Sequence, residues 1–310
     1  MTRNSRTSLA IVFVAVVLST AIAYGSALVS ARPTQGVVTS QVPANPRVQT
    51  IQFESKLVGK TLPYNVLLPV NYNQPDSRTK RYPVIYLLHG LTGHYTNWLE
   101  KTKLVDYTVP YEFIIVMPEG NDGWYTDSAT VPTDKYESYI LQELIPDVEK
   151  RFRASGDAGS RAIAGLSMGG YGALKFGVKY PQQFVFVASM SGALGAASWT
   201  ESDLKGLEFI LRSLQSVYGS ASSPTRAAND LGRLYRDLPA ASIASLPYIY
   251  LDCGTEDQLS EVNRDFVAIL MTRKIPHEYR QLPGGHTWTY WDSQVQEVLR
   301  IASKRLGKGL

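Results

Sequence analysis

The stretch GLSMGG at residues 165–170 decides the fold expected of this chain. It follows a short apolar run at 162–164 and precedes a helical stretch from Tyr171 to Lys179. In that context the pattern G-x-S-x-G predicts a nucleophile elbow, a tight strand-to-helix turn that exposes the hydroxyl of Ser167 at the positive end of the helix. The glycines are needed because a Cβ at either position would clash. The alternative is a plain glycine-rich turn without a chemical role.

The surrounding sequence alternates between strand and helix patterns. Residues 47–54 and 60–68, separated by a turn at Gly59, predict an antiparallel hairpin. Short apolar runs typical of buried parallel strands follow at 84–88, 113–117, 162–164, 184–188 and 248–251, and a further strand is expected at 278–282. Helical stripes lie between or after them, at 136–148 with a kink at Pro146, at 262–269 and at 295–299. This order predicts an α/β fold with a mostly parallel central sheet and helices on both faces.

Length and composition limit the class of protein. The chain has 310 residues, of which 44% are hydrophobic and 19% charged, which excludes a disordered chain, a collagen-like fibre and a multi-span membrane protein. The net charge is only +4 and the basic residues are scattered, so nucleic acid is not an expected partner. We expect one catalytic domain at 48–310, with an insertion at about 193–245 over one end of the sheet.

The N-terminal 31 residues differ from the rest of the chain. Arg3 and Arg6 precede an uncharged run from Leu9 to Val29, which ends in small residues. This pattern predicts a signal peptide cleaved near Ala31, and the alternative is an uncleaved membrane anchor. Both place the rest of the chain outside the cytoplasm, as an exported protein or attached to a membrane through this segment. Residues 32–47 are expected to form a linker, and the single cysteine, Cys253, leaves no partner for an internal disulfide.

A serine nucleophile needs a histidine base and a carboxylate that orients it. Of the two histidines after Ser167, His286 lies in a glycine-rich loop, PGGHTW at 283–288, whereas His277 begins a strand and is expected to be structural. Asp257 follows the 248–251 strand and is the predicted acid. Asp252, expected to be a structural hydrogen-bond acceptor, and Glu256 are its competitors.

Two backbone N–H groups are required to stabilise the oxyanion that forms when an acyl group is attacked. The residue after the nucleophile, Met168, provides one. The loop HGLTG at 89–93 follows the first parallel strand, and its Leu91 is the candidate for the second. His89 and His94 do not fit the base position in chain order and are expected to be structural.

Five segments together resemble the esterase D family of α/β-hydrolases, which includes S-formylglutathione hydrolase, tributyrin and feruloyl esterases, and secreted mycolyltransferases. They are HGLTGHYTNW (89–98), MPEGNDGWYTDS (117–128), GLSMGGYGAL (165–174), LDCGTEDQL (251–259) and PGGHTWTYW (283–291). The resemblance runs from about residue 48 to 305. It implies an α/β-hydrolase fold, the triad Ser167, Asp257 and His286, and oxyanion donors at Leu91 and Met168. No metal or organic cofactor is implied.

We therefore expect an exported serine carboxylesterase that hydrolyses small-molecule esters through an acyl-enzyme. The alternative is a mycolyltransferase-like enzyme that moves the acyl group to a sugar or alcohol, and a non-catalytic protein that has kept the fold is a third hypothesis. Several aromatic residues fall near the expected site loops, either to line a pocket or to pack the loops: Trp98, Trp124, Tyr125, Trp288, Tyr290 and Trp291.

Overall fold

The computed structural model describes residues 45–306. The predicted signal or anchor segment, 1–31, and residues 32–44 of the predicted linker lie outside the described residues. Within 45–306, no helix combines the length and the apolar character needed to cross a membrane.

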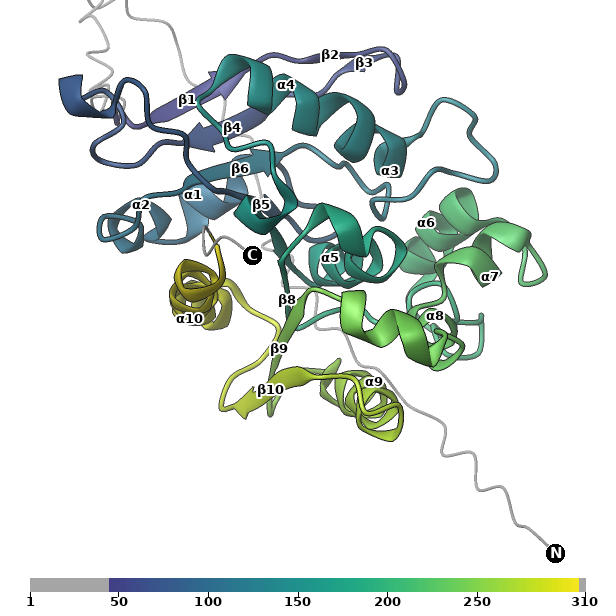
Figure 1. Ribbon diagram of the computed structural model, residues 1–310. Helices are drawn as coiled ribbons and strands as arrows, with labels where there is room; N and C mark the ends of the chain where they lie inside the picture. The colour runs from purple at the N-terminus through teal and green to yellow at the C-terminus, as the bar shows by residue number, and fades with distance from the viewer. Residues whose placement is uncertain (1–44, 307–310) are drawn as a thin grey trace, which may run out of the picture.

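An eight-stranded sheet forms the centre of the described chain (Figure 1). Its strand order is β1-β4-β6-β5-β7-β8-β9-β10. The strands β5 to β10 run parallel to one another, while β4 is antiparallel to β6 and β1 is antiparallel to β4. The bounds are β1 Val48–Ile51, β4 Tyr64–Leu67, β5 Val84–Leu88, β6 Ile114–Pro118, β7 Arg161–Leu166, β8 Phe186–Met190, β9 Tyr248–Gly254 and β10 His277–Leu282. A small separate hairpin pairs β2 Glu54–Ser55 with β3 Lys60–Thr61.

Helices cover both faces of the sheet (Figure 1). One face carries α1 Asn97–Lys101, α2 Leu104–Tyr107 and α10 Trp288–Arg305. The other face carries α3 Tyr136–Ser138, α4 Ile145–Arg151, α5 Met168–Lys179, α8 Leu231–Arg236 and α9 Ser260–Thr272. Between β8 and β9 the chain also forms α6 Glu208–Tyr218 and α7 Pro224–Asn229. Short 3₁₀ turns occur at Pro75–Ser77, Ala158–Ser160, Pro181–Gln183 and Ala240–Ser245.

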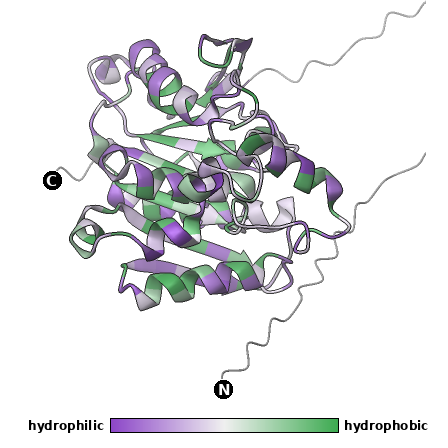
Figure 2. Ribbon diagram, turned by 90° about the vertical axis from the view of Figure 1, so that its right-hand side faces the viewer, coloured by the Kyte–Doolittle hydropathy of each residue, from purple (hydrophilic) through white to green (hydrophobic). Residues whose placement is uncertain are grey.

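The side chains of each central strand point alternately to the two faces of the sheet, which explains why helices cover both faces. In β5, Val84 and Tyr86 pack into the core under α5, whereas Ile85 and Leu87 pack into the core under α10. Successive side chains of a strand point to opposite faces, so a strand that is apolar at every position needs helices on both sides. Figure 2 shows the result, with largely hydrophobic strands inside helices of mixed character.

The expected α/β architecture is confirmed, with local differences. The N-terminal hairpin pairs antiparallel as predicted, with Val48 opposite Leu67. The strand expected at 184–188 begins and ends two residues later, because its last residues, Ser189 and Met190, pair with β9. The strand expected at 248–251 extends to Gly254, so Asp252 lies inside it rather than at its end.

The helical stripe that begins at Tyr136 is irregular where the kink was expected. A π-helical segment, Tyr139–Leu144, separates α3 from α4, and Pro146 follows in the first turn of α4. Proline has no N–H, so the carbonyl of Gln142 loses its regular helical donor, and the wider π turn lies immediately upstream.

The first part of the 193–245 segment lies at the end of the sheet where the parallel strands finish, whereas α8 packs against α5 on the face of the sheet. This first part brings α6 close to the β7–α5 turn, since Ile210 of α6 and Ser167 border the same cavity, and Ala193 N–H donates to the carbonyl of Ser167 at 3.0 Å. The carboxyl end of a parallel sheet is where α/β proteins bind ligands.

Candidate active site

Ser167 occupies the turn between β7 and α5 in a strained conformation. Its φ is 52° and its ψ is −115°, a region that side-chain-bearing residues rarely adopt. The turn is tightly packed, since a Cβ on Gly165 would lie 2.5 Å from the backbone of Gly169, and one on Gly169 would lie 2.6 Å from the carbonyl oxygen of Leu88. The neighbouring strand holds the turn in place, because Ser167 N–H donates to Met190 at 2.9 Å. The predicted elbow is therefore present.

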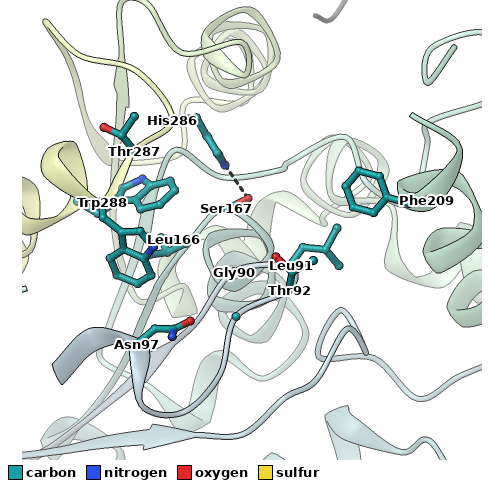
Figure 3. Close-up of a pocket in the computed structure, with 12 residues that line it drawn as sticks. Gly90, Leu91, Thr92, Asn97, Leu166, Ser167, Phe209, His286, Thr287 and Trp288 are labelled. Carbon is teal, nitrogen blue, oxygen red and sulfur yellow. Dashed lines mark hydrogen bonds between the residues drawn. The ribbon is translucent and has the colours of Figure 1, made fainter. Parts of the chain in front are cut away.

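The structure brings the three predicted side chains into one hydrogen-bonded chain. The Oγ of Ser167 lies 3.0 Å from Nε2 of His286 (Figure 3). Nδ1 of the same imidazole lies 2.9 Å from Oδ2 and 3.2 Å from Oδ1 of Asp257. With Nδ1 protonated, His286 donates to Asp257 and accepts from the Ser167 hydroxyl.

Asp257 is buried, with its side chain fully shielded from solvent. Burial by itself would raise the pKa of this carboxyl, but the hydrogen bond and charge of His286 and the N–H of Leu259, 2.8 Å from Oδ1, hold the pKa below its ordinary value. Asp257 thus remains a carboxylate next to the imidazole.

Glu256, an alternative candidate for the acid beside His286, is hydrogen-bonded to the loop that carries His286. Its carboxylate accepts from the N–H of Gly284 and from the hydroxyl of Thr255, and its backbone N–H donates to the Gly284 carbonyl at 3.0 Å. The loop after β9 and the loop after β10 are therefore joined beside the Asp257–His286 pair.

The two predicted oxyanion donors stand beside Ser167. Met168 is the first residue of α5, and among the described residues neither its N–H nor that of Leu91 donates to a protein acceptor. The loop that bears Leu91 is held by His89, whose Nε2 accepts from Gly120 N–H at 2.9 Å and whose Nδ1 lies 2.7 Å from the carbonyl of Gly90. His89 is structural, as expected.

A pocket of about 390 Å³ opens above Ser167 (Figure 3). Trp288 lies on one side of Ser167 and the exposed ring of Phe209, from α6, on the opposite side. The pocket is lined by Gly90, Leu91, Thr92, Gly93, Asn97, Leu166, Ser167, Phe209, His286, Thr287, Trp288 and Trp291. Ser167, His286 and Leu91, one of the predicted oxyanion donors, thus line the same open space.

Comparison with known proteins identifies the family. A family model named "Esterase" and described as "Putative esterase" matches residues 55–301. The chain belongs to this esterase family.

Relatives and solved structures agree with that assignment. The esterase is 28% identical over 263 residues to an acetyl esterase of Caldicellulosiruptor saccharolyticus, covering 83% of this chain and 98% of that protein. It is 32% identical over 264 residues to the esterase Rv1288 of Mycobacterium tuberculosis, covering 79% of this chain but only 56% of that protein. A solved ferulic acid esterase superposes with a TM-score of 0.70 at 28% identity, covering 84% of this chain and 98% of that one. The expected α/β-hydrolase fold and family are confirmed.

The remaining histidines lie away from Ser167 in the esterase. His277 begins β10, and its Nδ1 lies 2.7 Å from the carbonyl of Ile275. His94 is exposed and approaches Glu119 at 3.3 Å. Neither contacts the nucleophile, which agrees with the structural roles expected of them.

The sequence suggested that Asp252 is a hydrogen-bond acceptor in a loop, but in the structure this residue lies within strand β9. Its side chain is completely buried within β9, and neither carboxylate oxygen has a hydrogen bond of regular geometry within residues 45–306. Burial raises the pKa of Asp252 to about 7, although the nearby hydroxyls of Tyr290 and Tyr250 oppose the shift. Asp252 lies inside the sheet because β9 continues three residues further than its apolar run.

The aromatic residues divide between the two roles considered for them. Trp98, Trp124, Tyr125 and Tyr290 are buried and pack around the site, with the indole N–H of Trp98 donating to the carbonyl of Leu88 at 3.1 Å. Trp288 and Trp291 line the pocket, and the Trp291 ring stands edge-on to His286 at 4.8 Å between centroids.

Lys175 is a supporting residue that sequence reasoning missed. It is completely buried in α5, and its ammonium donates to the carbonyl of Tyr125 at 2.6 Å and to Glu137 at 2.8 Å. Burial lowers its pKa to about 8, against the opposing charge of Glu137. Trp124 and Tyr125 both have φ of 50°, and Lys175 fixes this strained turn beside the site. A lysine within the apolar stretch 171–178 was the available signal.

We predict that Asp252→Asn changes the pH dependence of stability and not the reaction. The carboxyl ionises near pH 3.8 in the unfolded chain and near pH 7 in the folded esterase, so the folded state holds an extra proton between these values. Its contribution to stability therefore falls as pH rises through that window and stays low above it. Urea unfolding at pH 5 and pH 8 measures this difference. The free energy of unfolding should fall less between the two pH values in the variant than in the wild type. Activity reduced as strongly as by Asp257→Asn would contradict the assignment of Asp257.

Proposed function

We propose that this esterase hydrolyses carboxylic esters through an acyl-enzyme on Ser167, with His286 as general base and Asp257 as the acid that orients it. The observation that carries the proposal is the unbroken chain from Ser167 Oγ to His286 Nε2 at 3.0 Å and from His286 Nδ1 to Asp257 Oδ2 at 2.9 Å, at the floor of a pocket.

The proposed reaction has two halves. The Oγ of Ser167 attacks the ester carbonyl carbon while Nε2 of His286 takes the hydroxyl proton, and the carbonyl oxygen becomes an oxyanion that accepts from Leu91 N–H and Met168 N–H. The C–O bond to the alcohol then breaks, and His286 gives its proton to the departing oxygen. Water, deprotonated by His286, attacks the acyl-enzyme in the same manner, releasing the carboxylic acid and restoring Ser167.

The positive end of α5 supports oxyanion formation. Met168 N–H belongs to the first turn of this 12-residue helix, where the helix dipole favours negative charge. Because the donors are backbone groups fixed by packing, they need little rearrangement when the oxyanion forms.

We further propose that the esterase acts outside the cytoplasm, after cleavage near Ala31 or while held by residues 1–31. The support is the sequence alone: two arginines, a long uncharged run and small residues at its end. The catalytic domain would then be residues 48–310, joined to the segment by a linker at 32–47.

Replacing the nucleophile tests the proposal directly. Ser167→Ala should lower kcat for a p-nitrophenyl ester by about 10⁴- to 10⁶-fold, because no side-chain oxygen remains to form the acyl-enzyme. A fluorophosphonate should label the wild type once and not the variant, with mass spectrometry as the readout. A folded variant that keeps more than about a tenth of the activity would overturn the assignment.

Asp257→Asn should lower kcat on the order of 10⁴-fold, since an amide cannot hold Nδ1 of His286 protonated and does not stabilise the imidazolium. The matched control is Asp252→Asn, the other buried aspartate of the same β9 region. Steady-state assays of both variants should show the large loss only for Asp257. Adding an alcohol acceptor to the wild-type assay measures whether the acyl group goes to water or to the alcohol, which separates hydrolysis from acyl transfer.

The export proposal predicts a new N-terminus close to Arg32 in protein recovered from outside the cytoplasm. Intact-mass analysis and N-terminal peptide mapping would measure it. Membrane-bound protein that retains residues 1–31 would establish the anchor instead, and full-length protein confined to the cytoplasm would refute both forms of the proposal.

A further inference from the structure

Ser167 borders two cavities of different character. The first is the open pocket of about 390 Å³, which His286 also lines. The second is a smaller and more enclosed chamber of about 30 Å³ that reaches Ser167 but not His286. The side chains around this chamber, apart from Ser167, are apolar or aromatic: Trp124, Ala193, Trp199, Leu204, Leu207, Ile210 and Leu259.

The chemistry at Ser167 assigns a direction to each part of an ester. The tetrahedral carbon bonded to Oγ carries the oxyanion, the alcohol oxygen and the acyl chain. The oxyanion must face Leu91 and Met168, and the alcohol oxygen must face His286 to receive a proton as it leaves. The acyl chain is therefore directed away from His286, and the chamber is the cavity on Ser167 that His286 does not line.

We propose that this chamber, termed the acyl chamber, binds the acyl chain and restricts the enzyme to esters of acetic acid and similarly short acids. The inference rests on the proposed hydrolytic function and adds the substrate class. The alcohol part of the ester then occupies the open pocket beside Trp288 and Trp291, where a much larger group fits.

Size supports the restriction. A cavity that holds a benzene ring has a volume of about 150 Å³, whereas a cavity that holds one water molecule needs only about 10–15 Å³. The acyl chamber has a volume of about 30 Å³, which is enough for a methyl group and too small for an aromatic ring or a long alkyl chain.

The walls of the chamber are fixed by packing. Leu204, Leu207 and Ile210 are 2%, 6% and 5% exposed, respectively. Trp124 is held from two sides, since its indole N–H donates to Ser213 of α6 at 2.9 Å and its ring meets Tyr171 edge-on. A densely packed wall does not yield to a longer chain without strain.

The chemical character of the walls selects an uncharged alkyl group. The indole N–H of Trp124 is already used by Ser213, and the other wall side chains except Trp199 have no polar atom. A carboxylate or hydroxyl on the acyl chain would lose its hydration without gaining a partner, which is unfavourable. Methyl and ethyl groups have no polar atom and therefore do not carry this desolvation cost.

The experiment varies the acyl group while the alcohol stays p-nitrophenol. Wild-type kcat/KM should fall by about tenfold or more from the acetate to the butyrate ester, and the benzoate ester should be the poorest, since each methylene that does not fit an apolar pocket is worth about 10- to 200-fold. Ser167→Ala supplies the blank for each ester.

Leu207→Ala, which enlarges the acyl chamber, should raise the butyrate-to-acetate ratio of kcat/KM by about tenfold or more. Leu204→Ala opens the chamber from a second position, in case the first variant does not fold. The matched control is Leu214→Ala, which removes a buried leucine of α6 that does not line the chamber, and it should leave the ratio within about twofold of the wild type.

The outcomes separate this inference from the proposed function. Wild-type hydrolysis of butyrate or benzoate as fast as acetate, abolished by Ser167→Ala, would overturn the acyl chamber and leave the serine mechanism standing. An unchanged ratio in a folded Leu207→Ala or Leu204→Ala variant would also overturn it. Hydrolysis of all the esters unaffected by Ser167→Ala would refute the proposed function, and the inference with it.

Discussion

The strained turn at Ser167 is the constraint on which the rest of the site depends. Ser167 has a φ of 52°, and the turn persists because its N–H donates to the carbonyl of Met190, the last residue of β8, while its carbonyl accepts from Ala193 N–H. The carbonyl of Leu88 lies where a side chain on Gly169 would project, so the loop after β5, which bears Leu91, can lie directly against the elbow. The unfavourable backbone geometry is thus held by close packing on two sides.

Parallel strand topology brings the other groups to this turn. Ser167 follows β7, Asp257 follows β9 and His286 follows β10, and these strands end at the same edge of the sheet. Loops at that edge meet although their residues are far apart in the chain, as with Ser167 and His286, which are 119 positions apart. The Glu256–Gly284 contacts then fix the acid loop to the base loop.

The two sides of Ser167 differ because they are built from different segments. On the His286 side, Trp288 at the start of α10 borders an open pocket. On the other side, the segment between β8 and β9 closes over the serine and packs against Trp124. Trp124 in turn lies in the strained loop whose Tyr125 carbonyl accepts a hydrogen bond from Lys175. A helix residue away from the pocket therefore supports a wall of the site.

The sequence by itself determined the strand-helix order, the elbow and the candidate triad Ser167, Asp257 and His286, because the hydrophobic period, the glycine spacing and the order of residues along the chain can all be read from the sequence. It could not distinguish the environment of Asp252 from that of a loop residue, since the length of β9 depends on pairing with β8 and β10. It also could not find the role of Lys175 or the enclosed chamber. Those features depend on where side chains from separate segments come to lie, and only close packing of the whole chain decides that.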